Sequence, residues 1–174
     1  GVHYMHLVDY AREVIEKTYK RPYAEQTLRI LLAWLLPRPN MFRLALLGAW
    51  LAKPFAALAP GRLKALLSMA PSHIPAPSSV DRPQVHAAVG LRRGRVALLI
   101  GCAQRVLNPS INEASIRLLN RCGIEVVVAR GADCCGALTH HMGLTSNSRA
   151  KAATNVQAWT AEIEGKGLDA IIIN

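Results

Sequence analysis

The sequence has few cysteines and few aromatic residues, and each shortage excludes a class of protein. Four cysteines in 174 residues are too few for a disulfide scaffold, and the adjacent pair Cys134 and Cys135 does not easily form a bridge with itself. Aromatic residues make up only 5% of a chain whose hydrophobic content is 51%. The apolar content is therefore mostly aliphatic, which favours helices and buried parallel strands over a β-sandwich. The length suits one domain, or one small domain with an appendage.

Long uncharged apolar runs are also missing. The longest such run, residues 44–52, has nine residues, whereas a helix needs ~20 apolar residues to cross a bilayer. We therefore predict no transmembrane helix. Residues 1–20 lack the cationic start and apolar run of a signal peptide. The chain begins with Gly1 and ends within an expected strand, so we expect a piece of a longer protein. The few cysteines, among them an adjacent pair, suggest a reducing compartment.

Acidic residues are absent from one long segment. Between Gln26 and Val80 there is no Asp or Glu, in a chain with a formal net charge of +10. The same segment carries six basic residues, which are Arg29, Arg38, Arg43, Lys53, Arg62 and Lys64. A basic, apolar segment of this kind can face anionic lipid, an acidic partner or nucleic acid. The alternative is a helical connector whose basic side chains are simply solvated.

Residues 1–70 predict a helical connector, and residues 71–94 an irregular linker. Apolar periodicity and proline positions place helices at 3–20, 24–36, 41–59 with an interruption near Pro54, and 61–70. The linker has four prolines and three serines and no apolar period.

Residues 95–174 predict an α/β domain. Short apolar runs indicate strands at 95–101, 124–129 and 168–174, and amphipathic segments indicate helices at 109–123 and 146–165. Residues 131–144 are expected to form a loop or short helix. The order β-α-β-α-β predicts a parallel, three-layer, Rossmann-like sheet. The expected inward residues are Ile111, Ser115, Leu118, Leu119 and Cys122 on the first helix, and Ala152, Val156, Trp159 and Ile163 on the second.

Three of the four cysteines follow predicted strands. Cys102 comes just after the first strand, and Cys134 and Cys135 come a few residues after the second. Because parallel strands end at the same edge of a sheet, we expect these thiols to converge there. Soft thiolates select iron–sulfur clusters, zinc or copper(I), and Gly136 lets the backbone approach such a group closely. The alternative is a set of separate buried thiols, which is our prediction for Cys122 at the end of a helix.

Other kinds of site lack their signatures. The segment after the first strand reads "GCAQRVL", without the glycines of a dinucleotide fingerprint. Asn108 stands where a cysteine phosphatase needs an arginine, and no Cys-x-x-Cys pair is present. His140 and His141 lie near the cysteine pair in the sequence. They could act as ligands or as proton relays, or they could be solvent-exposed side chains without such a role.

The run "GCAQRVLNPSINEASIRLLNRCGIEVVVARGADCCGALTHH" resembles the cysteine-rich CCG domain. That domain occurs in subunits of heterodisulfide reductase and in electron-transfer subunits of lactate-utilisation and glycerol-3-phosphate dehydrogenase systems. The features "GC-Q-VL-P-IN" and "CCGAL" sharpen the resemblance to iron–sulfur subunits of bacterial glycolate oxidases. Cys102, Cys134 and Cys135 match the motif, and Cys122 does not. A weaker likeness through "HLVDYARE" extends over the connector.

The resemblance implies an electron-transfer subunit, with 4Fe–4S clusters in full-length members. Its expected partners are flavin-containing glycolate-oxidising subunits and a membrane quinone, with no nucleic acid. Its expected place is the cytoplasm, peripheral at the inner face of the bacterial membrane. The resemblance also implies that glycolate chemistry occurs on the partner's flavin and that the fourth cluster ligand lies beyond this chain. The alternative is a docking domain whose cysteines are structural or bind zinc.

Overall fold

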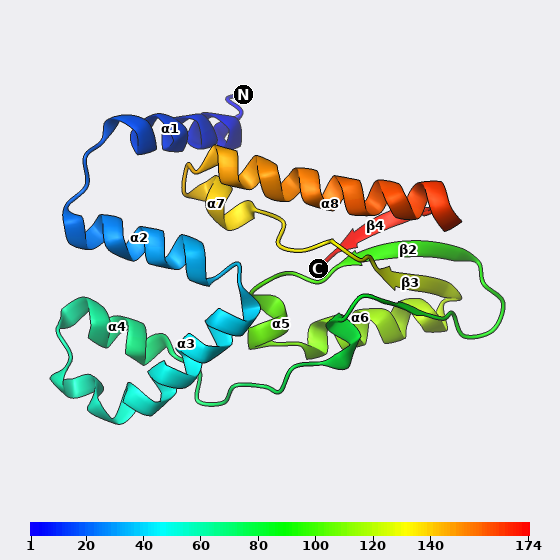
Figure 1. Ribbon diagram of the computed structural model, residues 1–174, viewed down its shortest axis with the longest axis horizontal. Helices are drawn as coiled ribbons and strands as arrows, with labels where there is room; N and C mark the ends of the chain where they lie inside the picture. The colour runs from blue at the N-terminus through cyan, green and yellow to red at the C-terminus, as the bar shows by residue number, and fades with distance from the viewer.

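The computed structural model describes residues 1–174 and begins with a helical connector (Figure 1). Its elements are α1 (Tyr4–Thr18), α2 (Tyr23–Leu35), α3 (Pro39–Ala52), the 3₁₀ helix η1 (Lys53–Leu58) and α4 (Gly61–Met69). Pro54 lies in η1, directly after α3, at the predicted interruption. Helices α1 and α2 bury none of their residues, so contacts at a few points hold the connector against the rest of the chain.

The second half of the chain alternates strands and helices. After η2 (Ser79–Asp81) and β1 (Gln84–His86) come β2 (Gly94–Leu99), α5 (Gln104–Leu107), α6 (Ser110–Arg121), β3 (Ile124–Val128), α7 (Ala137–His141), α8 (Thr145–Lys166) and β4 (Ala170–Ile173). The α/β class is as predicted, and α7 is the expected short helix between the second strand and the long helix. Helix α5 is an addition that the apolar pattern did not indicate.

The sheet has four strands in the order β1-β3-β2-β4. Strand β2 pairs in parallel with β3 and with β4, and Val96 has Val126 on one side and Ala170 on the other. Strand β1 adds to β3 in antiparallel register. The predicted purely parallel, three-stranded sheet is therefore corrected to a mixed sheet, because three residues of the proline-rich segment pair with the exposed edge of β3 and cover it.

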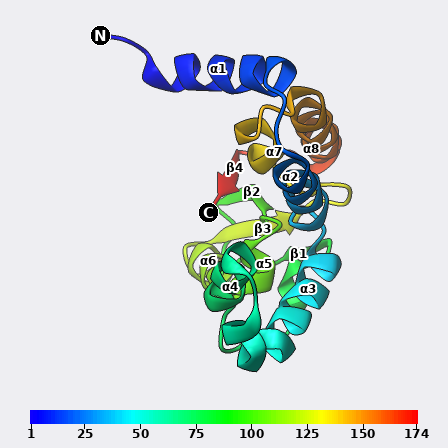
Figure 2. The same ribbon diagram turned by 90° about the vertical axis from the view of Figure 1, so that its left-hand side faces the viewer.

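The sheet is covered on both faces. Helix α6 lies along one face and α8 along the other, as the two views agree (Figures 1 and 2). The core on the α6 side consists of aliphatic side chains, which are Val96, Leu98, Ile100, Ile116, Val126 and Val128. Strand β2 is buried along nearly its whole length, as expected of a central parallel strand.

The predicted inward faces of both long helices are only partly right: Leu119 packs against the core and Trp159 is half-buried, but other predicted positions are exposed. On α6 the buried residues are Asn112 and Ile116, while Leu118 is exposed. On α8 they are Asn155 and Ala158, while Val156 is exposed. In both helices an asparagine is buried, although a prediction from the positions of the apolar residues alone places it on the solvent-facing side. The two helices are rotated accordingly, and each asparagine makes bonds that an outward position would lack.

The charged residue Arg95 is almost fully buried at the start of β2. Its Nε lies 2.8 Å from Glu125 Oε1, its Nη2 lies 2.7 Å from Glu162 Oε2, and its Nη1 donates to the Gly167 carbonyl at 2.8 Å. The guanidinium thereby ties β2 to β3 and to the end of α8. Every nitrogen has a partner, which is the condition under which a buried charge is tolerated.

One helical segment of the connector is long enough to cross a membrane. The segment Pro39–Leu58, formed by α3 and η1, has 20 residues and is long and apolar enough to span a bilayer, judged by length and composition alone. The prediction of no such helix rested on the nine-residue uncharged run, which Arg43 and Lys53 bound. The helical segment extends past both charges.

Candidate functional site

Cys102 and Cys134 lie together at the carboxyl edge of the sheet. Cys102 follows β2, Cys134 follows β3, and their Sγ atoms are 3.4 Å apart. Neither forms a disulfide, and Cys134 is only 2% exposed. The parallel pairing of β2 with β3 brings these thiols together, because both strands deliver the chain to the same edge.

Cys135 and Gly136 start the turn into α7. Cys135 is exposed, and its Sγ accepts the Ala137 amide at 3.4 Å, while Cys134 Sγ accepts the Gly136 amide at the same distance. Gly136 has a φ of +82°, and a Cβ there would lie 2.9 Å from the Ser148 carbonyl oxygen. Glycine is required because the loop turns through the left-handed region while touching the backbone of α8.

The pKa values of the two close thiols are displaced in opposite directions. The hydrogen bond from the Cys102 thiol lowers the pKa of Cys134 to about 6, and the Gly136 amide and Lys151 act in the same direction. The same sulfur–sulfur bond, together with burial, raises the pKa of Cys102. Of this pair, Cys134 is therefore the sulfur that ionises first, and a thiolate is the form that binds metals.

Two buried asparagines hold the cysteine loops, and the sequence analysis missed both. Asn155 on α8 accepts the Asp133 amide at 2.8 Å and donates to the Cys134 carbonyl at 3.1 Å. Asn112 on α6 is fully buried and accepts from Gln104 at 2.8 Å, in the helix that follows Cys102. An asparagine interrupting the apolar face of a helix was the available signal, since a buried amide needs several partners.

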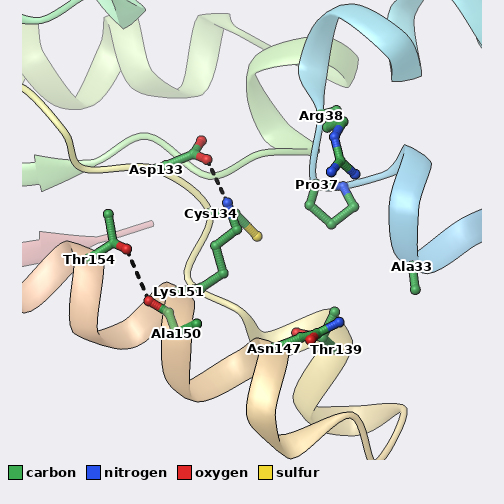
Figure 3. Close-up of a pocket in the computed structure, with 10 residues that line it drawn as sticks. All are labelled: Ala33, Pro37, Arg38, Asp133, Cys134, Thr139, Asn147, Ala150, Lys151 and Thr154. Carbon is green, nitrogen blue, oxygen red and sulfur yellow. Dashed lines mark hydrogen bonds and ion pairs between the residues drawn. The ribbon is translucent and has the colours of Figure 1, made fainter.

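Cys134 also lines a pocket of about 550 Å³ (Figure 3). The pocket lies between the turn that joins α2 to α3, the cysteine loop, and helices α7 and α8. Arg38 approaches from the connector side, and Lys151 reaches from α8 to Asp133 at 3.0 Å beside Cys134. The surroundings of the thiol are thus polar; the Asp133 carboxylate opposes negative charge on the Cys134 sulfur, and Lys151, which is paired with Asp133, favours it.

The remaining predicted residues lie elsewhere. Cys122 was predicted to be buried, but it is exposed at the carboxyl end of α6, because the rotation of that helix turns the position outward. His140 and His141 do not bond to the cysteines. They face Asp9 of α1, with His140 Nε2 at 3.1 Å and His141 Nδ1 at 3.7 Å from its carboxylate oxygens.

The donor set at the sheet edge suits a soft metal or a cluster. Two thiols are in contact, a third is adjacent in sequence, and backbone amides point at two of the three sulfurs. Thiolates of this kind bind iron–sulfur clusters and zinc. The three sulfurs do not all lie within 4.8 Å of one another; the one set of ligand atoms that does is Asp9, His140 and His141.

Comparison with known proteins gives one family and several relatives. Residues 96–174 match the family described as "Cysteine-rich domain" (CCG). The chain is 36% identical over 172 residues to the glycolate oxidase iron–sulfur subunit of Escherichia coli (strain K12), covering 99% of this chain and 39% of that protein. It is 28% identical to the probable glycolate oxidase iron–sulfur subunit of Bacillus subtilis (strain 168), covering all of this chain and 41% of that protein.

A shorter match links the chain to a third protein. Lactate utilization protein A 2 of Bacillus cereus (strain AH820) is 26% identical over 65 residues, which cover 37% of this chain and 27% of that protein. No solved structure matches. The chain spans about two fifths of the length of the two glycolate oxidase subunits.

Proposed function

We propose that this chain, whose residues 96–174 belong to the cysteine-rich CCG domain family, is part of the iron–sulfur subunit of a glycolate-oxidising complex. The likeness to glycolate oxidase iron–sulfur subunits over nearly the whole chain supports the assignment. The observation that carries it is that Cys102 and Cys134, which follow different strands, are brought together at the same edge of the sheet.

In this proposal the residues of the chain hold and tune a thiolate-bound centre. Cys102, Cys134 and Cys135 supply the sulfurs, and the amides of Gly136 and Ala137 stabilise negative charge on two of them. Asn155 fixes the backbone on either side of Cys134. An iron–sulfur cluster of the 4Fe–4S type supplies one-electron transfer when bound, with a further ligand from outside this chain.

The chain then serves as a conductor within a larger assembly. Electrons leave glycolate on the flavin of a partner subunit, pass through the iron–sulfur centres and reach a membrane quinone. Glycolate itself needs no acid or base from this chain, because hydride and electron chemistry belong to the flavin. The partners proposed are therefore a flavin-containing subunit and a quinone acceptor.

Cysteine variants of the full-length protein test the cluster assignment. Anaerobic reconstitution with iron and sulfide, followed by EPR and iron analysis, compares Cys102→Ser, Cys134→Ser and Cys135→Ser with wild type. Each is expected to lose the iron and the EPR signal of one centre and to slow electron transfer from glycolate to a quinone analogue. Cys122→Ser is the matched control, since that thiol is exposed and away from the edge. Unchanged iron content in Cys134→Ser contradicts the proposal.

The sulfur spacing favours a second candidate, a zinc-binding docking domain. Two thiolates bonded to one tetrahedral zinc at 2.3 Å are about 3.8 Å apart, which is near the 3.4 Å between Cys102 and Cys134. Metal analysis of the protein purified without oxygen separates the two. One equivalent of zinc at these cysteines, with complex assembly intact and no iron in this domain, supports docking in place of electron transfer.

We also propose that the connector contacts the inner face of the membrane. Along α3 and η1 a row of large apolar side chains is exposed, and it includes Leu44, Trp50, Leu51, Phe55 and Leu58. The six basic residues and the absence of acids in the surrounding segment suit anionic headgroups. Arg43 bonds the carbonyls of Pro75 and Arg105, which holds α3 along the side of the α/β domain and favours a surface position over a span.

Liposome flotation tests this contact with one acidic double variant and one control variant. Binding to vesicles containing anionic lipid is expected to weaken at high salt and in the double variant Leu51→Glu and Phe55→Glu. Leu91→Glu is the control, because Leu91 is 86% exposed but lies in the segment before β2. Equal binding of the double variant and this control argues against a membrane contact through α3.

A further inference from the structure

A cluster of metal-binding side chains lies outside the cysteine edge, where α1 rests against α7. Asp9 comes from α1, and His140 and His141 come from α7, the helix that follows the cysteine pair. Their ligand atoms all lie within 4.8 Å of one another. Both views show α1 packed across this end of the molecule beside α7 (Figures 1 and 2).

The spacing of the ligand atoms matches that around a tetrahedral zinc ion. Two nitrogen or oxygen ligands bonded at 2.0–2.1 Å to one tetrahedral ion are about 3.4 Å apart. Asp9 Oδ2 is 3.1 Å from His140 Nε2, and Asp9 Oδ1 is 3.7 Å from His141 Nδ1. The two contacts use different oxygens of Asp9, and the two histidine nitrogens lie within 4.8 Å of each other, so side-chain adjustment is needed to bring one oxygen and both nitrogens around one ion. Two imidazoles with one carboxylate are a common zinc ligand set.

The three candidate ligands are joined to one another and to Arg12 by hydrogen bonds that a bound cation would replace. Arg12 Nη1 lies 3.1 Å from His141 Nδ1 and 3.3 Å from Asp9 Oδ1. A guanidinium only donates, so His141 Nδ1 presents its lone pair and carries no proton. His140 Nε2 donates to Asp9 Oδ2 at 3.1 Å, so this nitrogen releases its proton when a metal ion binds. Arg12 therefore places positive charge beside the position that a metal ion would take.

The arrangement leaves room for a metal and its water. Arg12 is 42% exposed in its side chain, so it can swing away into solvent. A pocket of about 320 Å³ opens beside Asp9 and His140 and provides space for a fourth, water ligand. Glu13 also lines the pocket, but Lys17 holds its carboxylate at 2.6 Å. Three protein ligands and one open position result.

We propose that Asp9, His140 and His141 form a second metal site, distinct from the cysteines, that binds a zinc-class divalent cation through nitrogen and oxygen. The ion joins the connector to the segment that leaves the cysteine loop. That segment is already seated closely, since a Cβ on Gly143 would lie 2.5 Å from the Arg12 carbonyl oxygen. The site does not depend on the proposed function, and a zinc result here leaves the role of the cysteines open.

Cobalt spectroscopy and zinc calorimetry on the full-length protein test the site. Cobalt(II) bound by nitrogen and oxygen gives weak visible bands without the intense near-ultraviolet thiolate bands, which separates this site from the cysteines. We expect one such cobalt ion, displaced by zinc. His140→Gln and His141→Gln are expected to weaken zinc binding at least tenfold. Arg12→Gln keeps all three ligands, removes the competing charge and is expected to tighten binding severalfold.

His73→Gln is the matched control, since His73 lies in the exposed linker, and zinc affinity is expected to be unchanged. Thermal unfolding of each variant checks that the fold is intact. Absence of a nitrogen–oxygen cobalt spectrum in the wild type overturns the proposal. So does equal zinc affinity in wild type and His140→Gln, or weaker binding in Arg12→Gln.

Discussion

Replacing Gly136 by alanine tests how the cysteine loop is built. Gly136 has a φ of +82°, and its Cβ position lies 2.9 Å from the Ser148 carbonyl oxygen and 3.2 Å from the Lys151 Cβ. An L-residue in the left-handed region costs about 1–2 kcal/mol. The contact with the α8 backbone cannot be relieved by a side-chain rotation, and overpacking of this kind costs about 1–3 kcal/mol.

The backbone strain and the steric contact both arise at residue 136. Added together, they predict a loss of about 2–5 kcal/mol in the free energy of unfolding. For a chain of this size each kcal/mol corresponds to about 2–4 °C, so the melting temperature is expected to fall by roughly 4–20 °C. Circular dichroism during heating and urea titration measure the loss. We expect a further consequence at the sulfurs, because moving the loop stretches the bonds that Asn155 makes on either side of Cys134.

Gly165→Ala is the matched control for this prediction. Gly165 lies in the last turn of α8 with nothing within 4 Å of its Cβ position and no left-handed φ. Alanine there is expected to stabilise the helix by about 0.5–1 kcal/mol. If Gly136→Ala unfolds at the same temperature as wild type or as Gly165→Ala, the loop does not need glycine and the close approach to α8 does not restrict the side chain at this position.

Three further predictions concern the paired thiols and the buried Arg95. In the metal-free, reduced protein, Cys102→Ala is expected to raise the pKa of Cys134 from about 6 by about 1–2 pH units, while Cys102→Ser keeps a donor and changes it less; thiolate absorbance against pH measures this. Because the pKa of Cys134 is lowered on folding, its contribution to stability is complete above the ordinary thiol value of 9.0 and is lost as pH falls through about 6. Because the pKa of Cys102 is raised on folding, its contribution to stability falls as pH rises above 9.0. Arg95→Met leaves Glu125 and Glu162 without their shared guanidinium and is expected to cost about 3–5 kcal/mol in urea unfolding; a loss below 1 kcal/mol would show that water replaces the arginine.

The regular parts of the fold could be predicted from local pattern. The strands near 95–101 and 124–129 are runs of aliphatic residues, and prolines, glycines and changes of apolar period mark the ends of the longer helices, although not of α5. These signals suffice because a parallel strand that is buried on both faces is a nearly continuous run of apolar residues. The meeting of Cys102 with Cys134 follows from the same pattern, since parallel strands end at one edge.

The helix faces and the covering strand could not be read in this way. Asn112 and Asn155 are buried because loops far away in the sequence supply their hydrogen-bond partners, and an apolar count ranks both as outward residues. Strand β1 has no strong apolar period, and it pairs because β3 presents an open edge. Cys122 is exposed for the same reason that α6 is rotated, namely the seating of Asn112 in the core.

By itself, then, the sequence determined the β-α-β-α-β succession of elements after residue 94, the edge at which Cys102 and Cys134 meet, and the basic, apolar character of the connector. Only the tertiary structure decided which thiol ionises first, which side chains hold the loops, and that Asp9 meets His140 and His141 across the connector. The physical reason is the distance along the chain over which each signal acts. Periodicity and turn residues act within a few positions, whereas a pKa, a buried amide and a set of ligand atoms depend on neighbours that only folding brings within a few ångströms.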